Sequence, residues 1–295
     1  MSTPEADRGV AVILCTRDRP HLLGDALDAV MAAIRPSDEV VVVDSGSTDP
    51  HAVDPARQCG VTVVRLQQPG LSRARNAGVE ATSAPIVAFT DDDCRPAAGW
   101  AEVIARSFRD PGVGFMTGRA MADRVGRISV SCKLDEEPLH IAAAADPFSI
   151  GVGANMAMRR IALEGVGGFD ERLGAGARIR AGEDVDAWCR LIDAGWEGRY
   201  DPGCIVTHVQ WRSDAQALRL SYGYGLGAGA LAMKGIRSGR PGSLGLLGQR
   251  LWADGVGRAL SDLRHGYQSG AAASLLQAAG ALSGALQAAR WSRRP

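Results

Sequence analysis

Residues 86–93 read Ile-Val-Ala-Phe-Thr-Asp-Asp-Asp, a short apolar run that ends in three consecutive carboxylates. The run has the length and composition of a buried strand. The charges of Asp91, Asp92 and Asp93 repel one another, so a cation is needed to hold them close together. Carboxylates are ligands that Mg²⁺ and Mn²⁺ prefer, and α/β proteins bind ligands at the carboxyl edge of a parallel sheet. The triplet therefore predicts a metal site at such an edge.

A second interpretation is that the triplet caps a helix. Pro96 predicts a helix that opens there and runs to Arg106, and Asp is a favourable residue before a helix. One aspartate would be enough for a cap. Three aspartates after a buried strand favour the metal site.

Strand and helix patterns alternate around this stretch. The alternation predicts an α/β fold with βαβ units and a mainly parallel sheet. The expected strands are 10–15, 39–44, 61–66 and 86–90, and the expected helices are 20–33 and 70–81, with Ser72 as N-cap of the second. Three of these four strands end in polar residues, which the parallel arrangement brings to one edge.

The later part of the chain is less regular. Strands are expected at 113–117, 151–159 and 205–208, and a helix at 183–194. After Asp214 the composition changes to helix formers broken by Gly, with a break at 237–241. We therefore expect two domains, namely an α/β domain over 1–212 with halves at 9–110 and 111–212, and a C-terminal α-helical appendage over 213–295.

Charge and cysteine usage exclude several classes of protein. The 295 residues contain 33 Lys and Arg and 33 Asp and Glu, so no overall field recruits nucleic acid. The six cysteines form no CxxC pair, which argues against a structural zinc site or a disulfide framework. The polar N-terminus lacks the apolar core of a signal peptide. These features predict a cytoplasmic protein.

Two C-terminal segments bear on membranes. Residues 267–289 carry no charge and are long enough to span a bilayer, but their Ala, Gly and Gln content favours a packed or interfacial helix. Residues 218–237 combine aromatic, aliphatic and basic side chains. They are expected to pack on the rest of the protein or on a second subunit, as in a homodimer. The alternative is peripheral contact with the inner face of the plasma membrane.

Four polar motifs complete the candidate site. They are Cys15-Thr-Arg-Asp-Arg-Pro20, Asp44-Ser-Gly-Ser-Thr-Asp49, Gly70 to Gly78 with Arg75-Asn76, and Gly182-Glu-Asp184-Val-Asp186. With Gly153-Ala-Asn155, Gly167-Gly-Phe-Asp-Glu171 and Tyr200-Asp-Pro…His208, the ordered set resembles family 2 glycosyltransferases, which have the GT-A fold. The resemblance covers roughly residues 9–212.

The resemblance implies a role for each motif residue. Asp184 would be the catalytic base. A divalent metal, Mn²⁺ or Mg²⁺, would bind to Asp91 and Asp93 of the DxD motif, with His208 as a third ligand. Asp44 would contact the nucleotide base, and Arg75 would lie near the phosphates. The residues implied to bind the sugar nucleotide are Thr16, Arg17, Asp44, Arg75, Asp91 and Asp92.

The implied reaction is transfer of one sugar from a nucleotide-diphosphate donor to an acceptor hydroxyl. It is a single displacement with inversion (EC 2.4), in which the metal neutralises the leaving diphosphate. The acceptor is a carbohydrate, a lipid-linked molecule or a small molecule. Gln210-Trp211-Arg212 does not match the Gln-x-x-Arg-Trp motif of processive synthases, so we expect one sugar per encounter.

Two other functions stay open at this point. A nucleotidyltransferase also uses paired carboxylates, but it usually has a glycine-rich loop after the first strand, and none is present here. A non-catalytic sugar-nucleotide-binding protein would be expected to lack a DxD carboxylate or Asp184, and all are intact. The loop with Arg172, Arg178 and Arg180 is either a solvated loop or a lid over the site.

Overall fold

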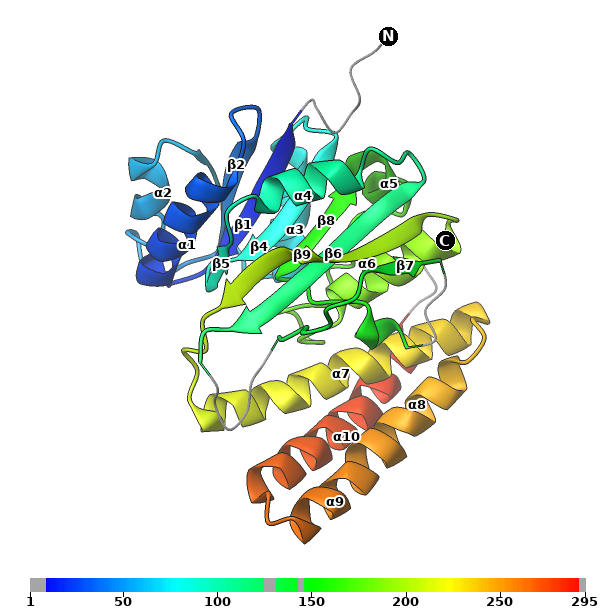
Figure 1. Ribbon diagram of the computed structural model, residues 1–295. Coiled ribbons are helices and arrows are strands. Elements are labelled where there is room, and N and C mark those ends of the chain that lie inside the picture. The colour runs from blue at the N-terminus through cyan, green and yellow to red at the C-terminus, as the bar shows by residue number, and fades with distance from the viewer. Residues whose placement is uncertain (1–8, 125–130, 143–145, 292–295) are drawn as a thin grey trace. The chain divides into compact units, whose positions relative to one another are not determined.

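The computed structural model describes residues 9–124, 131–142 and 146–291. Its first part is a parallel βαβ arrangement, as the sequence predicts (Figure 1). The strands lie in the order β3-β2-β1-β4 and are parallel to one another. The elements are β1 (Val10–Thr16), α1 (Pro20–Ala33), β2 (Glu39–Ser45), α2 (Asp54–Gln58), β3 (Thr62–Leu66), α3 (Leu71–Glu80) and β4 (Ile86–Asp91).

The sheet continues beyond β4 with strands of both directions. The antiparallel β8 follows β4, and the order continues β6-β9-β5, with β7 paired to β9. The strands are β5 (Cys94–Pro96), β6 (Val113–Ala122), β7 (Leu139–Ile141), β8 (Asn155–Arg159) and β9 (Glu197–His208); the helices are α4 (Trp100–Ser107), a 3₁₀ turn η2 (Pro147–Ser149), α5 (Arg160–Gly165) and α6 (Glu183–Asp193).

Three local predictions are wrong. Pro96 ends strand β5 and does not open a helix, because Cys94–Pro96 hydrogen-bond to β9; the helix begins at Trp100. Strand β9 starts at Glu197 and not at residue 205, because its first half pairs with β6. Ser72 lies inside α3, whose N-cap is Gly70.

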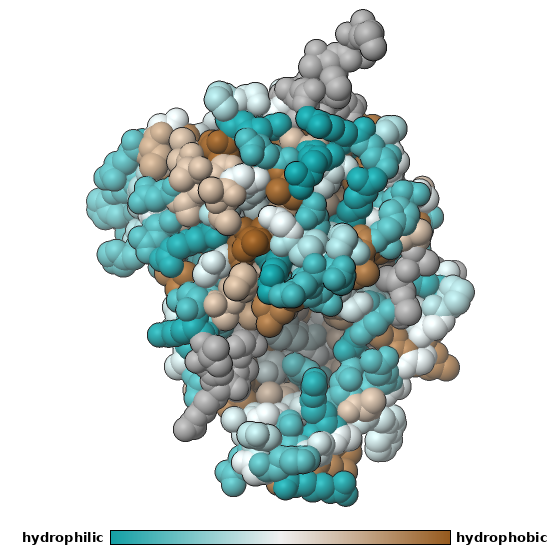
Figure 2. All heavy atoms as spheres, viewed as in Figure 1, coloured by the Kyte–Doolittle hydropathy of each residue, from teal (hydrophilic) through white to brown (hydrophobic). Residues whose placement is uncertain are grey.

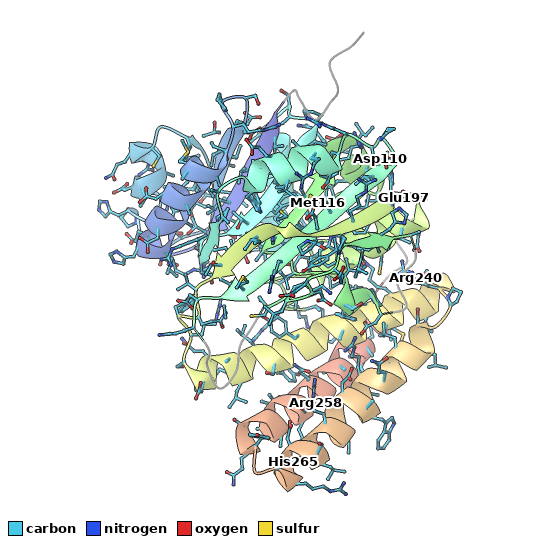
Figure 3. The ribbon with its side chains drawn as sticks, viewed as in Figure 1. Asp110, Met116, Glu197, Arg240, Arg258 and His265 are labelled. Atoms are coloured by element: carbon cyan, nitrogen blue, oxygen red, sulfur yellow. The ribbon has the colours of Figure 1, made fainter. Side chains whose placement is uncertain are left out.

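Helices cover both faces of the sheet. On one face, α1 and α4 pack on alternate residues of β1 such as Val12 and Leu14. On the other face, α3 approaches so closely that a Cβ on Gly78 would lie 2.4 Å from Ile13. Trp188 of α6 stacks on Phe115 of β6 on this second face. Met116, labelled in Figure 3, marks the middle of β6. The core therefore holds the strands rigidly and leaves their ends to carry the site.

The chain divides into two compact units. The first comprises 1–124, 131–171 and 184–210, and the second comprises 125–130, 172–183 and 211–295. Within the second unit the predicted helical region is confirmed as α7 (Asp214–Ser238), α8 (Ser243–Leu251), a π-helical turn η3 (Trp252–Gly257), α9 (Arg258–Arg264) and α10 (Gln268–Ala289). The domain division predicted at residue 212 stays a prediction.

Local sequence signals set the ends of α7. Ser213 and Gln216 form a capping box at its start. Gly239 and Gly242 have φ of +74° and +78°, which only glycine adopts easily, and they turn the chain into α8. No helix in the described part of the chain has both the length and the apolarity needed to cross a bilayer.

Candidate functional site

The polar strand ends meet at one edge of the first unit, as predicted. Thr16 of β1 is in register with Asp44 of β2, and Cys15 is in register with Asp91 of β4. The short β5 returns antiparallel to β9 and places Cys94 opposite His208. The topology therefore brings residues that are far apart in sequence to the same edge.

The three carboxylates of the triplet point to different partners. Asp91 ends β4 and lies 3.5 Å from Arg75 Nη2. Asp92 accepts a hydrogen bond from Thr16 Oγ1 at 2.7 Å and lies 3.0 Å from Arg19 Nη2. Arg19 also lies 3.5 Å from Asp93. Two arginines thus offset the charges of the triplet and reduce the mutual repulsion of its carboxylates.

Asp92 is the most buried member of the triplet. Its carboxylate is inaccessible to solvent, and burial raises its pKa to about 7. The charge of Arg19 and the Thr16 hydrogen bond act in the opposite direction, and the neighbouring Asp93 raises the pKa further. Asp92 thus contacts Thr16 and Arg19 at and just after the end of β1, and these contacts stabilise the turn that follows β4.

Asp93 and His208 form the pair best suited to hold a metal ion. Both are buried, and Asp93 Oδ1 lies 3.4 Å from His208 Nε2. Carboxylate oxygen and imidazole nitrogen are a donor set that suits Mn²⁺. Cys94 completes a group whose ligand atoms all lie within 4.8 Å of one another. Burial and then the nearby carboxylates raise the pKa of the Cys94 thiol well above its usual value, which disfavours the thiolate as a ligand.

Among the described residues, Asp91 is not part of the group formed by Asp93, Cys94 and His208. Its side chain is about one-third exposed, and Arg75 is its partner. The residues present therefore fit a divalent ion at Asp93 and His208, and Asp91 stands beside them at the solvent side. The metal role of all three residues stays a prediction.

Gln210 is a residue near this pair that the sequence did not single out. Its side-chain amide nitrogen lies 2.6 Å from His208 Nδ1, and both side chains are buried. The backbone of Gln210 is itself held by Asp123 and Arg124. The ring of His208 is thus fixed through its second nitrogen, while Nε2 faces Asp93.

Arg75 is a buried cation at the centre of the site. Only 2% of the residue is exposed, and its guanidinium donates to the carbonyl of Gly153 at 3.2 Å. It lies between the rings of Phe89 and Phe169, 5.9 and 5.6 Å from their centroids. The aromatic walls and the Asp91 ion pair hold its charge in a fixed position beside the end of β4.

Asp184 stands at the start of α6. Its Oδ1 accepts a hydrogen bond from the Val185 amide at 2.8 Å. Part of the residue reaches solvent, but its carboxylate is closely surrounded by protein atoms, and this desolvation raises its pKa. The charge of Arg75 partly offsets the rise. Arg75 therefore interacts electrostatically with both Asp91 and Asp184.

Asp44 is fully buried beside the turn that follows β2. Its Oδ1 accepts a hydrogen bond from the Ser47 amide at 2.8 Å. Its Oδ2 lies 3.3 Å from Arg65 Nε but has no hydrogen bond of acceptable geometry. A buried carboxylate oxygen of this kind has free capacity for an N–H donor. Arg65, on β3, was not predicted as part of the site.

The loops after β1 and β2 are tied together. Asp18 has φ of +52° and accepts hydrogen bonds from the amides of Thr48 and Asp49. These bonds, led by the one from Asp49, lower the pKa of Asp18. The side chain of the neighbouring Arg17 is 46% exposed, and its Nε lies 3.7 Å from Asp18 Oδ2. The pair of loops thus forms a preformed rim around Asp44.

Asn155 has a structural role. Its side-chain oxygen accepts from Trp100 Nε1 at 2.9 Å, and its nitrogen donates to the carbonyls of Arg119 and Cys204. The side chain is fully buried. The amide of this motif residue therefore binds backbone carbonyls and a tryptophan side chain of the protein itself.

A comparison with protein families gives the site its context. The model of glycosyl transferase family 2 matches residues 11–167, more than half of the chain. The chain belongs to glycosyl transferase family 2. The match includes Thr16, Asp44, Arg75 and the triplet, and ends before Asp184 and His208.

One similar protein is the pre-mycofactocin glycosyltransferase of Mycobacterium tuberculosis (strain ATCC 25618 / H37Rv). It is 34% identical to this chain over 184 residues, which are 57% of this chain and 37% of that protein. The chain thus spans well under half the length of this relative.

Solved structures identify the fold as GT-A. The mannosyltransferase PcManGT from Pyrobaculum calidifontis, in complex with GDP-Man and Mn²⁺, has a TM-score of 0.63 at 18% identity and covers 93% of this chain and 86% of its own. GalNAc-T7, with UDP, GalNAc and Mn²⁺, has a TM-score of 0.55 at 15% identity over 74% of this chain and 50% of its own. The predicted fold class is confirmed.

Proposed function

We propose that the protein transfers one sugar from a nucleotide-diphosphate donor to an acceptor hydroxyl, with a divalent metal and inversion at the anomeric carbon. The observation that carries the proposal is the electrostatic link at the sheet edge. Arg75 interacts with Asp91 of the DxD motif and with Asp184, and Asp93 faces His208. Donor-binding and base residues therefore lie together in one compact unit.

The donor nucleotide is assigned to the rim around Asp44. The free capacity of Asp44 Oδ2 suits the imide N–H of uracil or thymine, or the ring N–H of guanine. Thr16 and Arg17 lie at the end of the neighbouring strand β1 and complete this part. Arg75 and Asp91 are assigned to the diphosphate and sugar end. Asp92, expected from the sequence to bind the donor as well, is fully buried and is assigned a supporting role behind them.

Mn²⁺ or Mg²⁺ is assigned to Asp93 and His208, with Asp91 as a further ligand. When bound, the ion supplies positive charge that neutralises the diphosphate leaving group. The chain's own contribution is to hold the ligands: Gln210 fixes the His208 ring, and Arg19 lies 3.5 Å from Asp93. The Mn²⁺ complexes of the two structural relatives support this assignment.

Asp184 is assigned as the general base. It takes the proton of the acceptor hydroxyl while the hydroxyl oxygen forms the new bond to the anomeric carbon. The bond from that carbon to the diphosphate oxygen breaks, and its electron pair leaves with the diphosphate. A carboxylate whose pKa is raised by its surroundings is a better proton acceptor than an ordinary one. Attack opposite the leaving group inverts the configuration.

The acceptor is a carbohydrate, a lipid-linked molecule or a small molecule. Glycosylation of a cell-surface polysaccharide, a glycolipid or a natural product fits a family 2 enzyme that adds one sugar per encounter. We place the protein in the cytoplasm or at the inner face of the plasma membrane. The helices of the second unit are proposed to contact that membrane or a second copy of the chain.

Slow hydrolysis of the donor tests the proposed catalysis without knowledge of the acceptor. A panel of UDP-, dTDP- and GDP-sugars is incubated with the protein and Mn²⁺, and release of nucleoside diphosphate is measured. We expect one donor to be hydrolysed, EDTA to stop the reaction, and Asp184→Asn to slow it by roughly a hundredfold or more. Asp28→Asn, on the exposed side of α1, is the matched control. Equal rates for Asp184→Asn and wild type would remove Asp184 from the mechanism.

A further inference from the structure

The second unit exposes an unusual number of large apolar side chains. In the described part of the chain sixteen such side chains are exposed, and nine of them lie between Ser243 and Trp291. Leu244, Trp252 and Tyr267 are exposed by 73%, 70% and 65%. Figure 2 shows apolar and polar residues side by side on the visible face of these helices. Exposed apolar groups concentrated in this way mark an interaction surface.

Close contact with α7 decides which side of α10 is exposed. A Cβ on Gly280 would lie 2.3 Å from the Tyr222 carbonyl, and one on Gly284 would lie 2.0 Å from the Leu226 carbonyl. The glycine side of α10 must therefore face α7. The opposite side presents an uninterrupted apolar stripe at spacings of four, three and four residues, Leu275, Ala279, Leu282 and Leu286.

The segment from α8 to α9 has a second apolar stripe. It runs antiparallel to α10, since Gly255 meets Ala278 and Gly270 meets Asp262. Its buried positions include Gly255 and Ala259. The exposed apolar residues of this segment and the following turn are Leu244, Trp252, Leu260, Leu263 and Tyr267. We refer to these residues together with Leu275, Leu282 and Leu286 as the apolar face.

Charge identifies the partner of this surface. Residues 211–295 contain eleven Lys and Arg and three Asp, a net charge of +8. Because the whole chain balances at 33 and 33, residues 1–210 carry a net charge of −8. Arg258 and His265, labelled in Figure 3, and Arg264 are exposed on and next to α9. A second copy of this unit would bring two positive surfaces together, whereas an anionic surface would be attracted.

We propose that the apolar face docks on the surface of an anionic membrane. Leu, Trp and Tyr side chains enter the boundary between headgroups and acyl chains, and the arginines bind lipid phosphates. Residues 218–237, which the sequence offered as a segment that could contact a membrane, pack within the unit instead. Leu226 and Leu231 of α7 are buried, and α7 packs on α10 within the unit. The proposal does not depend on sugar transfer.

Vesicle sedimentation tests the proposal with the full-length protein. The vesicles are phosphatidylcholine alone or an equal mixture of phosphatidylcholine and phosphatidylglycerol. We expect wild type to sediment with the anionic vesicles at low salt and to be released as salt rises, since exposed charges are screened. Little protein should sediment with phosphatidylcholine alone.

Two surface variants separate the apolar and electrostatic contributions. The double change Trp252→Ser with Leu260→Ser should weaken partitioning roughly tenfold or more, and Arg258→Gln with Arg264→Gln should weaken it by a similar factor. The matched controls lie in the first unit: Ile161→Ser, which is 58% exposed, and Arg57→Gln with Arg106→Gln. These controls should bind like wild type.

Three results would overturn the proposal. The first is that wild type stays in the supernatant with anionic vesicles. The second is that the two surface variants sediment as well as the controls. The third is that sedimentation equilibrium shows a homodimer which Trp252→Ser with Leu260→Ser dissociates, while no vesicle binding occurs; the apolar face would then join two copies. Circular dichroism and melting curves show that each variant is folded.

Discussion

Asp184 combines two properties that predict a pH dependence. As the proposed base it must be deprotonated, and its burial raises its pKa above the ordinary carboxyl value of 3.8. Donor turnover should therefore rise with pH along an acid limb whose midpoint lies above 3.8, rather than stay flat from about pH 4 to pH 8.

The variant Arg75→Met should move this limb further. The charge of Arg75 lowers the pKa of Asp184, so its removal should shift the limb to higher pH. The measurement is the pH profile of kcat/KM for donor hydrolysis in both proteins. A profile without an acid limb above pH 3.8, or a limb that Arg75→Met leaves in place, would contradict the assignment of the base.

The contact between Gln210 and His208 leads to a separate prediction about the affinity for Mn²⁺. Its amide holds His208 through Nδ1 at 2.6 Å. If Nε2 were to hold an ion, Nδ1 would carry the ring proton, and the Gln210 amide would have to present its oxygen, in place of the nitrogen, to accept a hydrogen bond from it. Gln210→Ala should weaken Mn²⁺ binding about 10–100-fold, as loss of such supporting partners does. Calorimetric titration with Mn²⁺ measures this directly.

The control for this variant is Gln268→Ala, an exposed position at the start of α10. It should bind Mn²⁺ like wild type. If Gln210→Ala retains full affinity, then either His208 is not a ligand or its ring needs no support. Asp93→Ala and His208→Ala distinguish these two explanations.

At the scale of elements, the close packing of α7 against α10 depends on glycines in both helices. A Cβ on Gly229 would lie 1.8 Å from the Ala281 carbonyl, a backbone atom that cannot move aside. Gly229→Ala should therefore force the helices apart and destabilise the second unit by about 1–3 kcal/mol. The change is measured as a lower melting temperature of the helical transition.

Gly245→Ala in α8 is the matched control. No atom lies within 4 Å of the Cβ it would add, and alanine is the better helix former by up to about 1 kcal/mol. This variant should be as stable as wild type or more stable. Similar losses in both variants would show that helix propensity, and not the contact between α7 and α10, governs the effect.

The elements differ in how far the sequence predicts them. The parallel strands β1 to β4 are determined by local apolar runs, and their polar ends follow from the same pattern. Strand β5 depends on pairing with the end of β9, and the first half of β9 depends on pairing with β6, in each case more than 70 residues away in sequence. Local patterns carry no such information, and Pro96 was therefore assigned to a helix.

The same distinction holds for the site. Asp44, Arg75 and the triplet follow strands or open a helix, so their convergence could be predicted. Gln210 and the side-chain partners Arg19 and Arg65 become visible only when the strands are assembled. Sequence order alone indicated Arg19 as part of a motif but did not show that it binds Asp92 and Asp93.

On the scale of the whole molecule, the charge is divided between two parts of the chain. Residues 1–210 are acidic by eight charges, and residues 211–295 are basic by the same number. A neutral total therefore conceals an acidic part, to which we assign the cation and sugar-nucleotide site, and a basic part with an exposed apolar face. The family model matches residues 11–167, which lie within the first of these parts.

The central claim is that the Asp triplet forms a metal-dependent sugar-nucleotide site. The most direct measurement is calorimetric titration of the protein with UDP and GDP, with and without Mn²⁺, for wild type, Asp93→Ala and the exposed control Asp28→Ala. We predict that wild type and Asp28→Ala bind one nucleotide tightly only with Mn²⁺, and that Asp93→Ala loses this dependence with at least about a tenfold loss of affinity. Equal Mn²⁺-dependent affinity in Asp93→Ala and wild type would contradict the claim.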